Sequence, residues 1–216
     1  MIDLDGTLAD TVKDLAAATN LMLCELGRAP LAEARVRAFV GKGIPMLVKR
    51  ALVGALEGEP DAAEYERALA RYFDIYEKVN GAQATLYPGV REGLDALAHT
   101  CFPLVCVTNK AERFATPLLQ RLGIEHAFEF VVAGDTLPKR KPDPLPLTYA
   151  CGRLAIAPRD MLMIGDSLND AQAARAAGCP VFCVPYGYNE GADVRGLDVD
   201  AIVDTLFEAT KLITKS

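Results

Sequence analysis

From about residue 87 to the end of the chain, short apolar runs alternate with stretches of helical pattern. The runs show no alternation of apolar and polar side chains, which is typical of strands that are buried on both faces. Such strands form a parallel sheet that is covered by helices. The predicted strands cover residues 101–108, 130–133, 161–164 and 181–184, with a last edge strand over 201–203.

Helices fill the gaps between these runs. Pro88 favours a helix start, and Gly123 and Gly178 each follow a helical stretch in the position of a C-cap. The predicted helices cover residues 89–98, 111–122 and 168–177. Because strand and helix alternate along the chain, the sequence predicts an α/β fold whose core is a doubly wound, Rossmann-like parallel sheet.

Residues 11–85 follow a different pattern, because helical stretches succeed one another there without a strand between them. The clearest breaks are the segments 41–43 (Gly-Lys-Gly) and 58–60 (Gly-Glu-Pro). The predicted helices cover residues 12–26, 33–40, 44–56 and 62–79. We therefore expect an all-helical cap domain over residues 11–85, inserted into an α/β core formed by residues 1–10 and 86–216.

The charge balance indicates which binding partners the protein can have, and the cysteines indicate in which cellular compartment it works. With 23 Lys and Arg against 29 Asp and Glu, the net charge is −6, which argues against a general nucleic-acid-binding protein. Six cysteines form no C-x-x-C pair, and four of them lie in apolar runs, so we expect buried thiols in a reducing cytosol. No signal-peptide pattern and no bilayer-length apolar run is present, which predicts a cytoplasmic protein without a membrane partner. The four cysteines in apolar runs are Cys101, Cys106, Cys179 and Cys183.

Several catalytic chemistries are excluded by counting residues. The chain has two histidines, His99 and His126, and neither belongs to an H-E-x-x-H pattern. Ser167 lies in a Gly-Asp-Ser-Leu-Asn segment that lacks the second glycine of a nucleophile elbow. The sequence contains neither a Walker P-loop nor a G-x-G-x-x-G segment. Carboxylates are the abundant reactive groups that remain.

Four charged or polar clusters fall just after the ends of predicted strands. Because the carboxyl ends of parallel strands lie along one edge of a sheet, where ligands bind, we expect these distant segments to converge. Taken singly, each has an ordinary interpretation as a loop, a helix cap or a solvated basic run. Four of them in this order favour a common site. They cover residues 3–7, 108–110, 139–144 and 165–170.

The first cluster supplies two carboxylates that are suited to phosphoryl transfer. Asp3 is a candidate nucleophile that forms an aspartyl-phosphate. Asp5 is a candidate general acid toward the leaving oxygen and then a general base toward water. Gly6 lets the backbone turn sharply beside a bulky anion.

The other clusters supply metal ligands and phosphate-binding groups. Attack of a carboxylate on a phosphate dianion calls for a cation, and Asp3 and Asp166 are hard oxygen ligands of the kind that Mg²⁺ prefers. The remaining phosphate oxygens are expected to be held by the Thr108 hydroxyl, the Asn109 backbone N–H and the Lys141 ammonium.

These clusters resemble the four motifs of the haloacid dehalogenase superfamily, and the likeness covers essentially the whole chain, including a helical cap straight after the first motif. The matching segments are residues 3–10 (Asp-Leu-Asp-Gly-Thr-Leu-Ala-Asp), 107–109, 141–142 and 165–170. The resemblance implies the roles given above and adds two. The Asp5 backbone carbonyl is a further Mg²⁺ ligand, and Asp170 supports the metal indirectly or through a water.

Within that superfamily, the acid at Asp5 points to phosphate esters, because the dehalogenases and the phosphonatases lack an acid there. Weaker likenesses at residues 14–18, 40–43, 87–90, 141–144 and 186–189 resemble the phosphoglycolate phosphatases. The resemblance thus implies hydrolysis of 2-phosphoglycolate, a small phosphorylated metabolite. Three alternatives stay open: a β-phosphoglucomutase-like transferase, a phosphatase of another small sugar phosphate, and a non-catalytic binding module, which the complete motif set disfavours.

A substrate that carries a carboxylate calls for a further cation, and the expected cap offers two candidates. Lys42, between two glycines, is the first and Arg50 is the second. The alternative is that Gly-Lys-Gly is an interhelical turn with a solvated lysine.

The first strand departs from the family pattern, which places an apolar strand before the first Asp. Here only Met1 and Ile2 precede Asp3, whereas a typical strand has about 5–6 residues. Losing three or four buried apolar side chains would forfeit roughly 5–10 kcal/mol. We therefore expect the working protein to have several apolar residues upstream of Met1.

Overall fold

The computed structural model describes residues 1–213, and the core of the molecule is a parallel sheet. β3 (Val105–Val107) pairs with β4 (Phe130–Val132). β5 (Met163–Gly165) pairs with β6 (Val181–Cys183), which also pairs with β7 (Ala201–Ile202). All three pairings are parallel, and each strand lies within one of the five predicted apolar runs or at its end.

Residues 1–3 join the two halves of this sheet. Ile2 pairs in parallel with Cys106 on one side and with Ile164 on the other. The Asp3 backbone N–H donates to the Ile164 carbonyl at 3.0 Å. The order across the sheet is therefore β4, β3, residues 1–3, β5, β6 and β7, which puts the first segment at the centre of the sheet. The expectation of further residues upstream stays a prediction.

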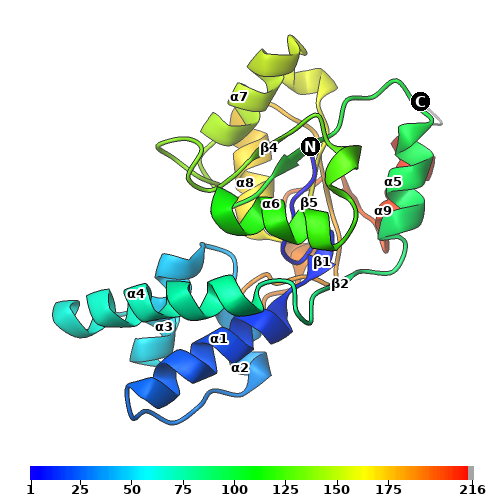
Figure 1. Ribbon diagram of the computed structural model, residues 1–216. Helices are drawn as coiled ribbons and strands as arrows, with labels where there is room; N and C mark the ends of the chain where they lie inside the picture. Colours follow the sequence, from blue (N-terminus) through cyan, green and yellow to red (C-terminus); the bar gives the residue numbers. More distant parts are fainter. Residues whose placement is uncertain (214–216) are drawn as a thin grey trace.

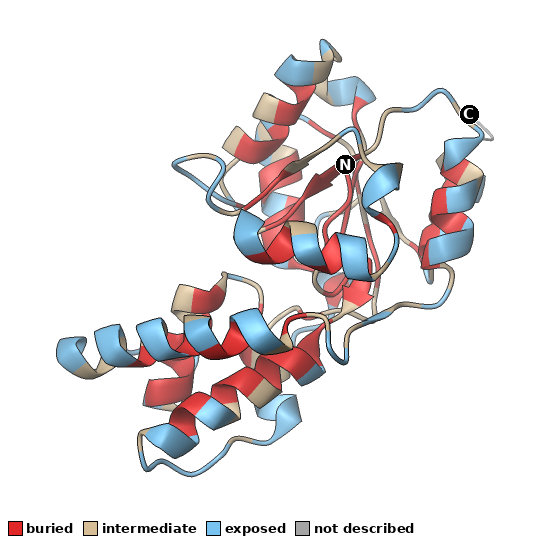
Figure 2. Ribbon diagram, viewed as in Figure 1, coloured by how far each residue is buried: buried red, intermediate tan, exposed pale blue. Residues whose placement is uncertain are grey.

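Helices flank the sheet on both faces (Figure 1). One face carries α5 (Val90–Ala98), α6 (Glu112–Arg121) and α9 (Leu206–Ile213), and the other carries α7 (Leu145–Leu154) and α8 (Leu168–Ala177). Each set shares a buried apolar cluster with the strands, and Figure 2 shows the buried stripes of these helices. This arrangement is the doubly wound α/β core expected from the alternating pattern. Short 3-10 helices occupy Glu125–Ala127, Pro158–Asp160 and Val194–Gly196.

A four-helix bundle lies apart from the α/β core in Figure 1. It consists of α1 (Val12–Glu25), α2 (Glu33–Phe39), α3 (Ile44–Val53) and α4 (Ala62–Val79). The bundle has its own buried cluster, which also includes Phe114 and Tyr188 from the core. Two short antiparallel strands, β1 (Ala9–Asp10) and β2 (Thr85–Leu86), carry the chain into and out of the bundle. We refer to the bundle as the cap; its exact limits at residues 11 and 85 stay a prediction.

Some boundaries differ from the predicted ones for identifiable reasons. α3 ends at Val53 rather than at residue 56, because Gly54 takes the left-handed conformation (φ +73°) that terminates a helix. β3 begins after Pro103, which has no N–H to give to a ladder. Cys101 is therefore exposed, and the expectation that it is buried is wrong. The other three cysteines of the apolar runs are buried as expected.

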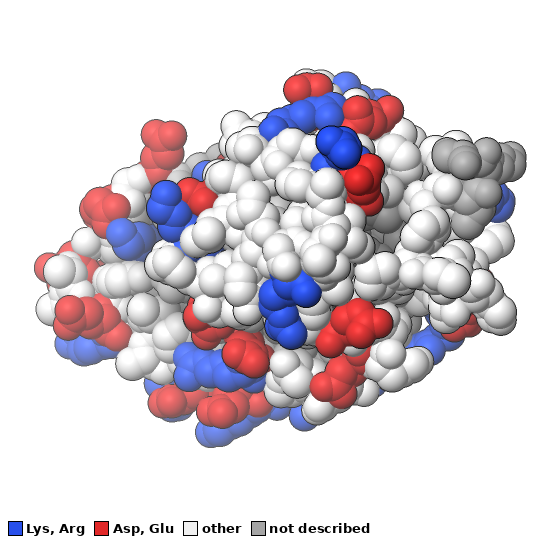
Figure 3. All heavy atoms as spheres, turned by 90° about the horizontal axis from the view of Figure 1, so that it is seen from above, with Lys and Arg blue, Asp and Glu red and all other residues white. Residues whose placement is uncertain are grey.

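The six cysteines, all within residues 1–213, carry free thiols. None of the helices described is both long and apolar enough to cross a membrane. On the face seen in Figure 3, basic and acidic side chains are interspersed around a largely uncharged area.

Candidate active site

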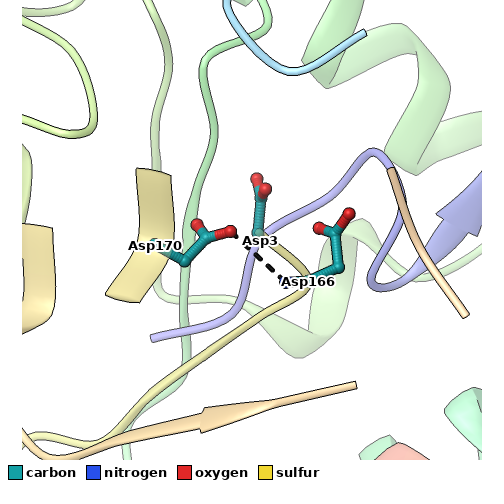
Figure 4. A group of neighbouring side chains, drawn as sticks. All are labelled: Asp3, Asp166 and Asp170. Atoms are coloured by element: carbon teal, nitrogen blue, oxygen red, sulfur yellow. Dashed lines mark hydrogen bonds between the residues drawn. The ribbon is translucent and has the colours of Figure 1, made fainter. Parts of the chain in front are cut away.

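Three predicted site residues, Asp3, Asp166 and Asp170, meet at the carboxyl edge of the sheet. Asp3 is the last residue of the central segment, Asp166 follows β5, and Asp170 lies in the first turn of α8. One carboxylate oxygen of each lies within 4.8 Å of those of the other two, and all three residues are buried. Figure 4 shows the side chains converging, with the hydrogen bond from the Asp166 N–H to Asp170 as a dashed line.

Lys141 lies against two of these acids. Its ammonium is 2.7 Å from Asp170 Oδ1, 3.0 Å from Asp3 Oδ1 and 2.6 Å from the Val107 carbonyl oxygen, so each of its three N–H donors has an acceptor. Burial by itself lowers the pKa of Lys141, but the Asp170 and Asp3 carboxylates outweigh that effect and raise it above the ordinary value. Lys141 is therefore a fixed cation between two acids.

Burial and mutual repulsion raise the pKa values of two carboxyl groups in the site. Burial raises the pKa of Asp3 to about 7, with Lys141 acting to lower it and Asp170 to raise it. Burial, followed by the charges of Asp170 and Asp3, holds the pKa of Asp166 well above its ordinary range. When all three carboxyl groups are ionised, the single ammonium of Lys141 leaves two negative charges uncompensated.

Hydrogen bonds and glycines hold Asp166 in place. Its Oδ1 accepts from the Thr7 hydroxyl at 2.8 Å, and its Oδ2 accepts from the Tyr188 backbone N–H at 2.6 Å. A Cβ at Gly6 or at Gly187 would collide with the Asp166 carboxylate, and Gly6 also has a φ of +91°. Glycine is required at residue 6 both for the turn and for the close approach of Asp166.

Asp170 organises the loop before α8. Its Oδ2 accepts hydrogen bonds from the Ser167 hydroxyl at 2.7 Å and from the Ser167 N–H at 3.1 Å, while its Oδ1 binds Lys141. Both oxygens thus have protein donors. The pairing of Oδ1 with the Lys141 ammonium is compatible with the indirect role expected for Asp170.

The donor set fits a hard divalent cation. The three neighbouring side chains offer carboxylate oxygens, which are the ligands that Mg²⁺ prefers. The two uncompensated negative charges match the charge of such an ion. Within residues 1–213, Asp3 Oδ2 has no hydrogen-bond donor, because the Leu4 N–H and Lys141 both contact Oδ1.

Asp5 lies beside a second lysine. Its Oδ1 accepts from the Thr11 hydroxyl at 2.6 Å and from the Lys110 ammonium at 3.0 Å. Lys110 also donates to the hydroxyl of Tyr76, in α4 of the cap, at 2.7 Å. Sequence reasoning placed Lys110 in a charged cluster but gave it no role, because its partners are 105 and 34 residues away along the chain.

Thr108 and Asn109 follow β3 directly. The buried Thr108 hydroxyl accepts from the Lys110 N–H at 3.2 Å, which leaves its own hydrogen free to donate. The Asn109 side chain donates to the carbonyl oxygens of Gly41 at 3.0 Å and of Lys141 at 2.9 Å. The Asn109 backbone N–H has no acceptor among residues 1–213. Two donors predicted for phosphate are thus available.

The cap and the core enclose a small pocket of about 50 Å³ at this point. A water needs about 10–15 Å³ by the same measure, so the pocket has room for a few waters. The core side contributes the polar groups, and the cap side contributes apolar side chains and two glycines. The lining residues are Asp3, Asp5, Leu15, Val40, Gly41, Gly43, Ile44, Leu47, Thr108, Asn109 and Lys110.

The two cap cations that the sequence suggested lie elsewhere. The Lys42 ammonium is 3.4 Å from Glu190 Oε1, its side chain is 43% exposed, and it does not line the pocket. Arg50 is buried, and its guanidinium binds Glu190 at 2.6 Å and the carbonyl oxygens of Phe39 and Leu56 at 3.0 and 3.1 Å. This arrangement gives no support to either residue as a ligand of the substrate, a role that stays a prediction.

Tyr188 connects the site to the start of the cap. Its hydroxyl donates to Asp10 Oδ1 at 2.6 Å and accepts from the backbone N–H of Thr11 at 2.7 Å. Arg37, in α2, packs over its ring with the guanidinium carbon 4.8 Å from the ring centre. No local sequence signal marks this contact, because Tyr188 and Asp10 are 178 residues apart.

Residues 1–184 match the family model of the haloacid dehalogenase-like hydrolases. The chain belongs to this family. Family membership confirms the resemblance seen in the four motifs, and the doubly wound core with a helical bundle is the architecture that the resemblance implied. The roles of the individual residues stay predictions.

Individual haloacid dehalogenase-like proteins resemble the chain over its whole length. A phosphoglycolate phosphatase of Nitrosospira multiformis is 60% identical over all of this chain and 95% of the relative. The phosphoglycolate phosphatase of Thiobacillus denitrificans is 50% identical, again over all of this chain and 95% of the relative. A crystal structure described as a predicted phosphoglycolate phosphatase from Haemophilus somnus superposes with a TM-score of 0.93 at 34% identity, covering 98% of this chain and 96% of that one.

Proposed function

We propose that this chain is a Mg²⁺-dependent phosphatase that hydrolyses 2-phosphoglycolate to glycolate and phosphate through an aspartyl-phosphate. One observation carries the proposal: Asp3 and Asp5 line the same small pocket, each beside its own buried lysine. The family makes the chain a hydrolase, and the relatives named phosphoglycolate phosphatase at 60% and 50% identity favour this phosphoric monoester.

In the first step, Asp3 attacks the phosphorus atom and the bond from phosphorus to the ester oxygen breaks. Asp5 gives its proton to that oxygen, so glycolate leaves with a neutral hydroxyl group rather than as an alkoxide. The Leu4 N–H and the Lys141 ammonium hold Asp3 Oδ1 at 2.7 and 3.0 Å, which fixes the orientation of the attacking carboxylate.

In the second step, Asp5 takes a proton from a water molecule whose oxygen bonds to phosphorus. The bond from phosphorus to the Asp3 oxygen breaks, which frees inorganic phosphate and restores the Asp3 carboxylate. The Thr108 hydroxyl and the Asn109 N–H, both without an acceptor among residues 1–213, donate to phosphate oxygens throughout, with Lys141 beside them.

Asp3, Asp166 and the Asp5 carbonyl would hold Mg²⁺. When bound, the ion neutralises charge on the phosphate so that a carboxylate can approach it. Asp170 acts by positioning Lys141 and the loop before α8, as its hydrogen bonds indicate.

The test is a panel of phosphomonoesters assayed for phosphate release with Mg²⁺ and no bisphosphate activator. The panel contains 2-phosphoglycolate, sugar phosphates and a chromogenic ester. We expect the highest kcat/KM for 2-phosphoglycolate and no turnover after chelation. Interconversion of sugar phosphates that depends on a bisphosphate would instead identify a β-phosphoglucomutase-like transferase.

A further inference from the structure

The active-site pocket contains a cation to which the sequence gave no role. Of the residues that line it within 1–213, Lys110 is the cationic one. Its side chain is 3% exposed, so its charge is felt inside the pocket with little screening by water. Lys42 and Arg50, the cations expected to read the substrate, do not line the pocket and share Glu190 instead.

The hydrogen bonds of Lys110 leave one donor unused. An ammonium has three N–H groups, and those of Lys110 reach Asp5 at 3.0 Å and Tyr76 at 2.7 Å. The third N–H has no acceptor among residues 1–213. A buried charged donor without a partner is costly, and an anionic group of a ligand in this pocket would satisfy it.

The position of Lys110 beside Asp5 indicates which ligand group the ammonium could bind. Asp5 serves the ester oxygen in the proposed reaction, and Lys110 lies directly beside it. In 2-phosphoglycolate a single methylene separates the ester oxygen from the carboxylate. A cation that binds that carboxylate must therefore lie next to the acid that serves the ester oxygen, and Lys110 does.

Resting on the proposed function, we propose that Lys110 is the residue that selects the substrate by binding its carboxylate. The class of substrate is a short phosphorylated hydroxy acid with its carboxylate one carbon away from the ester oxygen. The apolar cap side chains Leu15, Ile44 and Leu47, which face the same pocket, leave little room for a longer or more polar group. Tyr76 steadies the ammonium from the cap side.

The experiment compares two substrates of similar size, 2-phosphoglycolate and 2-hydroxyethyl phosphate, in which a carboxylate of the first is replaced by a hydroxymethyl group in the second. The quantity is the ratio of their kcat/KM values, so general damage to Asp5 cancels. In the Lys110→Met enzyme this ratio should fall by about 10- to 100-fold, which is the usual contribution of a hydrogen bond to a charged group. Lys110→Arg should keep most of the ratio, and Lys42→Met, the matched control, should keep all of it.

The outcomes separate this assignment from the proposed function. A wild-type enzyme that prefers 2-phosphoglycolate while Lys110→Met keeps its ratio, or while Lys42→Met loses it, would overturn the assignment alone. A wild-type enzyme without that preference would contradict the proposed substrate as well. Circular dichroism establishes that each variant is folded. If Lys110→Met does not fold, Lys110→Gln takes its place with the same expectation.

Discussion

At the scale of single residues, the site is a balance of buried charges. Lys141 is 2% exposed and touches two carboxylates, Asp3 and Asp170, so its ammonium allows both acids to be buried. Lys139, two positions earlier, is 65% exposed and pairs with Asp143 at the surface. The basic run of residues 139–141 thus contains one lysine that belongs to the site and one that does not.

Replacing these two lysines by alanine should have unequal effects. Lys141→Ala leaves two buried carboxylates without their counter-charge, which should lower the free energy of unfolding by about 3–5 kcal/mol. We expect kcat/KM to fall by at least about a hundredfold through the lost electrostatic stabilisation. Lys139→Ala should retain wild-type kcat/KM. Steady-state kinetics with urea unfolding curves measure both effects, and similar losses in the two variants would show that the wrong lysine was chosen.

At the scale of elements, the carboxyl edge of the sheet brings the motifs together, and this was predictable. Buried parallel strands read clearly in the sequence because their apolar runs lack alternation. α7 was not predicted, because Pro146 and Gly152 within it are poor helix formers. α9 was not predicted either. The contacts of Lys110 and Tyr188 could not be predicted, since each joins segments that are distant along the chain.

α1 depends on a cap from outside its own segment. Thr11, its N-cap residue, makes no side-chain cap, and the Tyr188 hydroxyl accepts the N–H groups of Thr11 and Val12 at 2.7 and 3.1 Å, with Asp10 Oδ1 as a second acceptor for the Val12 N–H at 3.2 Å. Tyr188→Phe should lower the free energy of unfolding by about 1–2 kcal/mol, the usual worth of a helix cap. Denaturant titration measures the change. Tyr149→Phe is the control, because that hydroxyl has no hydrogen bond within residues 1–213, and equal stability of both variants would refute the capping role.

At the scale of the whole molecule, the stability of the metal-free protein should depend on pH. Asp3 has an ordinary pKa of 3.8, which burial raises to about 7 in the folded chain. Between these values the folded state holds a proton that the unfolded state has lost, so the free energy of unfolding falls as the pH rises from about 4 to about 7. The raised pKa of Asp166 acts in the same direction.

Mg²⁺ should reverse this loss, because it binds ionised carboxylates. We expect the increase in Tm on adding Mg²⁺ to a chelator-treated sample to be larger at about pH 8 than at about pH 5. Differential scanning calorimetry at matched ionic strength measures it, with Asp3→Asn as the control that removes the Asp3 contribution. An increase that is the same at both pH values would argue against a cation at these acids.

The most direct measurement of the central claim is to trap the phosphorylated enzyme. Wild-type protein is allowed to turn over 2-phosphoglycolate that carries a radioactive phosphorus label, in the presence of Mg²⁺. The reaction is quenched in acid, and the labelled peptides are mapped. We predict that the label resides on the peptide that contains Asp3, and that the Asp3→Asn enzyme carries no label and turns over at less than about a hundredth of the wild-type rate. Phosphate release without label on that peptide, or faster turnover by Asp3→Asn, would contradict the account.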